Sequence, residues 1–253
     1  MRTEPIGIGV TSPDWMYLAP GGPVARGVFK DIRPGIYRGH FESYKAEISA
    51  YELDKLLGLQ MVPPTVEKRV KGDLGMAAME VTSAETVRSL GVFPTPPVAK
   101  TAWRTIQLTR AKMFDNPINN RDPNEGNWMI DPAWNIILID HSRAFRTGTD
   151  LPHEMAFIDR DLWHRIEQLD EATLRDSLGG WLSDREVRAI LERREVMAEE
   201  IGRLVAEAAR GDLDVFVVYP DGLAAGRWLS GCFDTHPVKR PASRSLVQSP
   251  REA

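Results

Sequence analysis

The sequence contains a single cysteine, Cys232, which excludes an intrachain disulfide and any C-x-x-C metal or redox motif. None of the five histidines is spaced as H-x-x-x-H or a similar ligand pair, so a structural zinc site is not expected. No run approaches the ~20 apolar residues of a membrane span, and no apolar segment follows the first five residues. These absences exclude a transmembrane helix and predict no signal peptide.

An excess of positive charge is also missing. The formal net charge is −4, which gives no footprint for nucleic acid. The 253 residues, 42% of them hydrophobic and 27% charged, are ordinary for a soluble chain and suffice for one large domain or two lobes with ample core. We therefore expect a cytoplasmic bacterial-type enzyme or binding protein that does not bind nucleic acid.

The chain is organised around the stretch Phe114–Phe145. Asp122 and Asn127 are separated by four residues, and Asp140 directly follows the apolar run Ile136–Ile139. The run is short, β-branched and bounded by turn residues, which predicts a buried strand that ends at a carboxylate. Enzymes of the protein-kinase type use such a set: one Asp serves the attacking hydroxyl, while an Asn and a second Asp hold metal. By chance alone, D-x-x-x-x-N also occurs in many loops.

Two residues in the first half are candidates for nucleotide binding. Lys30 ends an alternating strand, where it either reaches the α/β-phosphates or lies exposed at a sheet edge. Glu47 lies on the flank of the apolar stripe of a predicted helix, 44–58. It is either a solvated glutamate or the partner that aims Lys30 at the phosphates. The predicted strand 75–81 leads to a hinge at Glu80 and Val81, whose backbone groups are expected to bond an adenine ring.

The other segments are assigned by pattern. Residues 31–43 are expected to form a loop, 82–97 a connection between lobes, and 236–253 a disordered tail rich in Pro, Ser and Arg. The interleaved Arg and Glu residues of the last helix are expected to be a solvated face. The remaining predicted elements are strands or extended segments at 6–30, 66–70 and 215–219, and helices at 100–113, 159–169, 171–178 and 183–210, the last with a capping box.

With Lys30, Glu47, Asp122, Asn127 and Asp140 in this order, the chain resembles the atypical kinases of the HipA, Golgi secretory-kinase and phosphatidylinositol-kinase-like grouping. AEISAYELDKLLGLQMVPPTVEK resembles the helix-then-VPP segment that follows their nucleotide lysine. FDNPINNRDPNEGNWMI resembles their catalytic loop F-D-x-x-x-x-N-x-D-R-x-x-x-N, and ILIDHSRAF resembles their metal-binding I-D-x-x-x-x-F. The resemblance covers roughly residues 24–205.

The resemblance implies a bilobal α+β kinase-like fold with an N-lobe at 1–82, a C-lobe at 83–210 and a C-terminal extension at 211–253. It implies ATP with Mg or Mn, and transfer of phosphate to a hydroxyl acceptor, whether protein Ser/Thr, a sugar or a lipid head group. By the same resemblance, Lys30 holds the phosphates, Glu47 orients Lys30, Asp122 is the catalytic base, and Asn127 and Asp140 bind the metal.

The chain departs from the pattern of these kinases at two places. Arg121 precedes Asp122 where the relatives carry Asp-Arg-His after the Asn, and His141-Ser142 follows Asp140 in place of Phe-Gly or Asn-Gly. Asp115 is a second candidate carboxylate. Two alternatives therefore stay open: a pseudokinase that binds nucleotide or a partner without turnover, and a nucleotidyltransferase of the same fold that transfers AMP.

Overall fold

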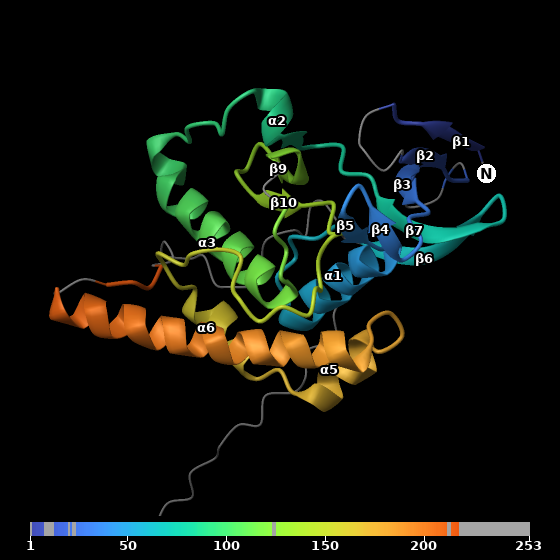
Figure 1. Cartoon of the computed structure of the whole chain (residues 1–253). Helices are drawn as coiled ribbons and strands as arrows, with labels where there is room; N and C mark the ends of the chain where they lie inside the picture. Colours follow the sequence, from blue (N-terminus) through green and yellow to red (C-terminus); the bar gives the residue numbers. More distant parts are fainter. Residues whose placement is uncertain are drawn as a thin grey trace, which may run out of the picture.

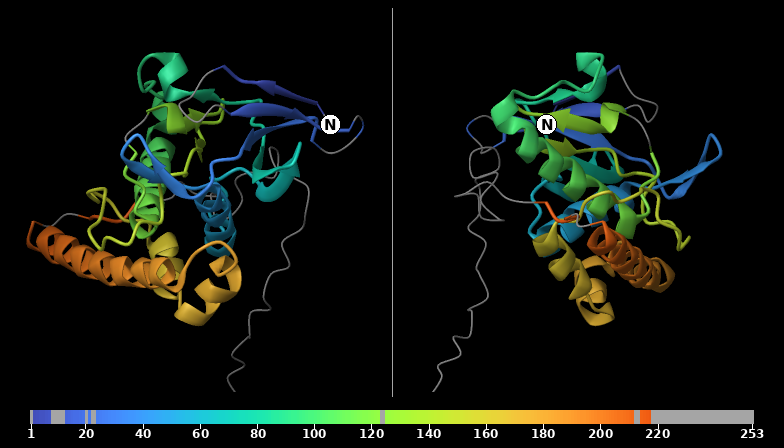
Figure 2. Two further views of the ribbon diagram at one scale, coloured as in Figure 1. Left: turned by 45° about the vertical axis from the view of Figure 1, so that its right-hand side comes forward. Right: turned by 90° about the vertical axis from the view of Figure 1, so that its left-hand side faces the viewer.

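The computed structural model describes residues 2–7, 13–19, 21, 24–122, 125–211 and 214–217. An antiparallel sheet with one long helix forms the N-terminal part, and a mostly helical region follows (Figure 1). The two views in Figure 2 show the same division from other sides. The fold class is therefore α+β, as predicted. No helix in these ranges combines the length and apolar composition needed to cross a bilayer.

The N-terminal sheet has five antiparallel strands in the order β1-β2-β3-β7-β6. Their bounds are β1 Arg2–Pro5, β2 Asp14–Tyr17, β3 Arg26–Lys30, β6 Thr65–Val70 and β7 Asp73–Met79. Side chains that alternate along these strands gather on one face as a small apolar cluster of Met16, Phe29, Val70 and Ala77. Lys71 and Gly72 join β6 to β7 with φ values of 51° and 102°, a turn that suits the twist of the two strands.

Gly75 allows β7 to approach the end of β3. A Cβ atom at this position would lie 2.2 Å from the carbonyl oxygen of Lys30 and 2.8 Å from the Cα of Asp31. Because both neighbours are backbone atoms, no side chain fits here without displacing a strand. The glycine therefore helps to fix the backbone from which Lys30 projects.

Residues 31–43, predicted as a loop, contain a two-stranded hairpin of β4 (Gly35–Tyr37) and β5 (His40–Glu42). Arg38 and Gly39 form its turn with φ values of 50° and 85°. Arginine rarely adopts the left-handed conformation. Because Arg-Gly stands where such a turn usually has Asn-Gly or Asp-Gly, the sequence gives no hairpin signal, and the loop prediction is wrong.

Helix α1 (Tyr44–Leu57) lies between the sheet and the C-terminal helices (Figure 1). Ser43 caps its start by accepting the N–H of Lys45. Gly58, the last residue of the predicted range 44–58, ends the helix in the left-handed conformation. The buried Asp54 accepts backbone N–H groups from Gln60, Met61 and Val62 at 2.9–3.2 Å. The segment after the helix is thereby fixed.

The C-terminal part contains a three-stranded sheet, order β10-β9-β8, and the helices that form the main core. Its elements are β8 Glu85–Thr86, α2 Val87–Leu90, the 3-10 turn η1 Val98–Lys100, α3 Thr101–Ile118, the 3-10 turn η2 Glu125–Asn127, β9 Trp128–Ile130, β10 Ile136–Leu138, α4 Arg160–Glu167, α5 Glu171–Leu178 and α6 Asp184–Arg210. Ser183 and Glu186 form the predicted capping box of α6.

Helix α3 is longer than predicted, since it continues past Met113 to Ile118 with Pro117 inside it. A proline this close to the C-terminus removes one helical bond, and Asn119 then closes the helix in the left-handed conformation. Asp115, expected near the start of a loop, is consequently on the helix and buried.

The predicted strand at 215–219 is in part a single pairing, in which Ile158 bonds Val215 and Val217 at 2.8 and 2.9 Å. Residues 218 and 219, Cys232 and the tail predicted as disordered lie outside the described residues.

Candidate functional site

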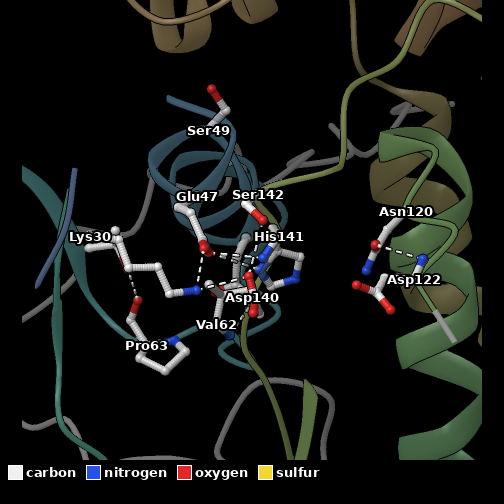
Figure 3. A network of polar contacts seen from close by, with 12 residues as sticks. Lys30, Glu47, Ser49, Val62, Pro63, Asn120, Asp122, Asp140, His141 and Ser142 are labelled. Carbon is white, nitrogen blue, oxygen red and sulfur yellow. Dashed lines mark hydrogen bonds and ion pairs between the residues drawn. The ribbon is translucent and has the colours of Figure 1, made fainter. Parts of the chain in front are cut away.

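Three charged side chains meet where the N-terminal sheet faces the C-terminal part. Lys30 comes from the end of β3, Glu47 from the first turn of α1, and Asp140 from the loop after β10 (Figure 3). The Nζ atom of Lys30 lies 2.8 Å from Oε1 of Glu47 and 2.8 Å from Oδ1 of Asp140. Both side chains are buried. Lys30 is therefore not an exposed lysine at a sheet edge, and Glu47 is not a solvated glutamate.

The charges of this triad stabilise one another. Burial opposes the charged form of Lys30, but the attraction of Asp140 and Glu47 outweighs it and raises the pKa of the ammonium group. Burial likewise opposes the charged form of Asp140, but Lys30 outweighs it and lowers the pKa of the carboxyl to about 2. Burial raises the pKa of Glu47, while Lys30 acts in the opposite direction. Lys30 and Asp140 are therefore an ion pair at neutral pH.

The loop at Asp140 is held in an unusual conformation. Asp140 has a φ of 63°, which a non-glycine residue rarely adopts. The hydroxyl of Ser142 donates to Oδ1 of Asp140 at 3.1 Å, and the N–H of His141 donates to Oε2 of Glu47 at 2.8 Å. Such over-determined backbone strain is typical of functional sites.

His141, which directly follows Asp140, is a core residue. Burial lowers the pKa of its imidazole to about 4, so the ring is neutral at pH 7. It lies edge-on to Phe114, with ring centroids 6.0 Å apart. The departure at this position therefore adds no charge beside Asp140.

Asn127 lies next to this loop, because its carbonyl accepts the N–H of Ile139 at 2.9 Å. Its side chain is buried, and Nδ2 has no hydrogen-bond partner among the described residues. A buried polar group of this kind is uncommon, and a phosphate oxygen would satisfy it. The side chain of Asp140 is 32% exposed, which leaves it accessible to a ligand.

The donor set of Asn127 and Asp140 fits a hard divalent cation. Mg²⁺ is usually held by one or two protein carboxylates together with substrate phosphates and waters. In the part of the chain that the structure describes, no three His, Cys, Asp or Glu side chains form a metal-binding group of their own. The amide oxygen of Asn127 and a carboxylate oxygen of Asp140 therefore suit a metal whose other ligands are nucleotide phosphates and waters.

Asp122 stands apart from the triad, on the loop that follows α3 (Figure 3). Polar contacts fix the loop: the N–H of Asp122 donates to Oδ1 of Asn120 at 3.4 Å, and the side-chain Nδ2 of Asn120 donates to Oδ1 of Asp115 at 2.9 Å. His153 contacts the carbonyl of Asn120 at 3.0 Å. Asp115, considered as a second candidate carboxylate, thus lies beneath the loop and supports it.

The buried carboxyl of Asp115 makes the stability of this loop depend on pH. Burial raises its pKa from the usual 3.8 to about 7, against the opposing hydrogen bond from Asn120. Because the folded pKa is the higher one, the stability contributed by this group is fully present below about pH 4 and is lost as the pH rises through about 7. We expect Asp115→Asn to raise the melting midpoint by roughly 3–6 °C at pH 8 and by little at pH 4.

Melting curves at the two pH values check this expectation, with Asp115→Ala as the comparison. The alanine leaves the amide of Asn120 without its acceptor and should lower the midpoint at both pH values. If Asp115→Asn were equally destabilising at pH 4 and pH 8, the carboxylate would be ionised in the folded chain throughout.

The predicted hinge residues are placed at the end of β7. The carboxylate of Glu80 forms an ion pair with Arg26, whose Nε lies 2.7 Å from Oε2, and the N–H of Glu80 donates to the carbonyl of Arg26 at 3.3 Å. The carboxylate and the N–H of Glu80 therefore both bind Arg26 of β3. A contact with adenine at Glu80 and Val81 stays a prediction.

Sequence patterns missed one buried residue that joins two segments of the site. Arg193 on α6, expected on a solvated face, is fully buried and donates to the carbonyls of Pro117, Arg146 and Gly148. It joins the end of α3 to the segment after Asp140. An arginine among many others in an Arg/Glu-rich helix gives no local signal of burial.

The fold is that of the atypical kinases. The structure of hydra Fam20 with sugar matches with a TM-score of 0.61 and 14% identity, over 85% of this chain and 87% of that chain. The Golgi casein kinase with Mn/ADP bound matches with a TM-score of 0.56 and 15% identity, over 87% and 76%. The Helicobacter pylori proinflammatory kinase CtkA matches with a TM-score of 0.51 and 10% identity, over 83% and 95%. No protein-family model and no curated protein sequence matches the chain.

Proposed function

We propose that the protein is an ATP- and divalent-metal-dependent phosphotransferase that acts on a hydroxyl acceptor. The observation that carries the proposal is the triad: Lys30 lies within 2.8 Å of both Glu47 and Asp140, three residues that the sequence separates widely. Kinase-type phosphoryl transfer needs such a lysine on a strand, paired with a helix glutamate, beside a metal-binding aspartate. The Mn/ADP complex of the Golgi casein kinase supports nucleotide and metal as ligands of this fold.

Each residue has a defined role in this proposal. Lys30 neutralises charge on the phosphates, and Glu47 keeps its ammonium group oriented. Asn127 and Asp140 would hold Mg or Mn, which neutralises the charge that develops on the transferred group. Asp122 accepts the proton of the acceptor hydroxyl. The hydroxyl oxygen forms a bond to the γ-phosphorus, while the bond between the γ-phosphorus and the bridging oxygen breaks and ADP leaves. Glu80 and Val81 are proposed to lie beside the adenine.

The first test is the melting midpoint of the protein with ATP, with and without Mg or Mn. At a hundred times its Kd, a ligand that binds only the folded state adds about 2.7 kcal/mol, or roughly 5–10 °C for a chain of this size. We expect a metal-dependent rise that is lost in Asp140→Ala. Asp176→Ala, an exposed carboxylate on α5, is the matched control and should keep the rise.

Labelled ATP then separates the three functions that the sequence leaves open. Transfer of the γ-label to an acceptor or to the protein itself supports the phosphotransferase, and transfer of the α-label supports a nucleotidyltransferase. A metal-dependent rise without transfer of either label supports the pseudokinase. No rise with any nucleotide or metal would contradict the phosphotransferase and the nucleotidyltransferase, and would leave only a pseudokinase that binds a partner.

A further inference from the structure

The segment after Asp140 is attached to the start of α1 along its backbone. The N–H of Ser43 donates to the carbonyl of Ser142 at 2.9 Å, and the N–H of Ala144 donates to the carbonyl of His141 at 2.9 Å. The N–H of His141 is bound by Glu47 in turn. These bonds fix the turn that carries the next side chain, Arg143.

The guanidinium of Arg143 connects two carboxylates from different parts of the chain. Its Nε and Nη2 atoms each lie 2.8 Å from Oε1 of Glu42, which is the last residue of β5 and only 2% exposed. Its Nη1 atom lies 3.5 Å from Oδ2 of Asp122. One arginine thus joins the residue that leads into α1 to the candidate catalytic base.

We propose that Arg143 is a positioning residue, which holds the carboxylate of Asp122 in a fixed place relative to the start of α1. The proposal rests on the proposed function, in which Asp122 receives the proton. A guanidinium is planar, so binding two of its nitrogens to a buried carboxylate also determines where the third nitrogen lies. Lysine carries the same charge but lacks this geometry.

The same helix end then orients both halves of the site. Glu42 and Glu47 flank the first residue of α1, Tyr44, and hold Arg143 and Lys30 respectively. Any displacement of this helix end moves the side chains of Glu42 and Glu47 together. The proposed position of Asp122 is therefore coupled to that of Lys30 through this helix end.

The kinetic test compares Arg143→Ala and Arg143→Lys with Arg146→Ala, an exposed arginine on the same segment. A displaced base lowers kcat, so we expect a loss of about 10–100-fold in both Arg143 variants, with KM for ATP within about threefold of wild type. Arg146→Ala should be unchanged. In an Asp122→Ala background, Arg143→Ala should cause no further loss. Full kcat in Arg143→Lys would show that only the charge matters and overturn the proposal.

A second test needs no turnover. In a double-mutant cycle on the melting midpoint without nucleotide, Arg143→Ala and Asp122→Ala should be non-additive by about 1–2 °C. If Arg143→Ala does not fold, Glu42→Gln/Arg143→Ala leaves no unpaired buried carboxylate and takes its place. If Arg143 were coupled to Glu42 and not to Asp122, the proposal would be overturned, and Arg143 would only hold the chain at the start of α1. If the wild type transfers no phosphate, the proposed function fails, and this cycle alone decides whether Arg143 positions Asp122.

Discussion

Replacement of Lys30 by methionine is expected to abolish phosphate transfer and to destabilise the fold at the same time. The variant leaves Glu47 and Asp140 facing each other without the cation that lies 2.8 Å from both. Breaking a buried ion pair by removal of one partner typically costs about 3–5 kcal/mol, because the remaining charge stays desolvated. The metal-dependent rise of the melting midpoint with ATP should also shrink, since the phosphates lose their cation.

Denaturant unfolding of the single and double variants separates these effects. Lys30→Met/Glu47→Gln removes one buried charge of each sign and should recover part of the lost stability, but no transfer activity. Lys45→Met is the matched control, a partly buried lysine of α1 that lies outside the triad. If Lys30→Met were as stable as wild type and kept the response to ATP and metal, Lys30 would not be the nucleotide lysine.

The parts of the site that the sequence predicts are those with a local pattern. The apolar run before Asp140 indicates a strand that ends at this residue, and β10 is observed there. The i, i+4 spacing from Tyr44 and the stop at Gly58 indicate α1, which places Glu47 on a helix. These local elements left the solvated glutamate and the exposed lysine open, and only the resemblance to kinases paired Glu47 with Lys30.

The parts that the sequence does not predict depend on contacts between distant residues or on rare backbone conformations. Arg143 and Glu42 are 101 residues apart, and no periodicity connects them. The turn of the β4–β5 hairpin contains Arg38 in a conformation that propensities assign to glycine or asparagine. Pro117 suggests a break within α3, where the helix in fact continues for one more residue.

Replacement of Asp122 by asparagine is expected to remove transfer while it preserves nucleotide binding. General base catalysis contributes about 10²–10⁴ to a rate, and an amide cannot accept the proton. Asp122 lies on a different loop from the triad, and asparagine keeps an oxygen that accepts from Arg143. We therefore expect a loss of kcat in this range, with a wild-type rise of the melting midpoint in ATP and metal.

Asp140→Ala is the comparison for this prediction, since that variant should lose both phosphate transfer and the rise of the melting midpoint in ATP and metal. Asp176→Asn, an exposed carboxylate on α5, controls for the loss of a charge. Full transfer by Asp122→Asn would exclude Asp122 as the base. Asp115 would not be a substitute, because it is only 2% exposed and its carboxylate binds Asn120 beneath the loop. The role of Asp122 would then be limited to orienting the acceptor hydroxyl, which an asparagine oxygen can also do.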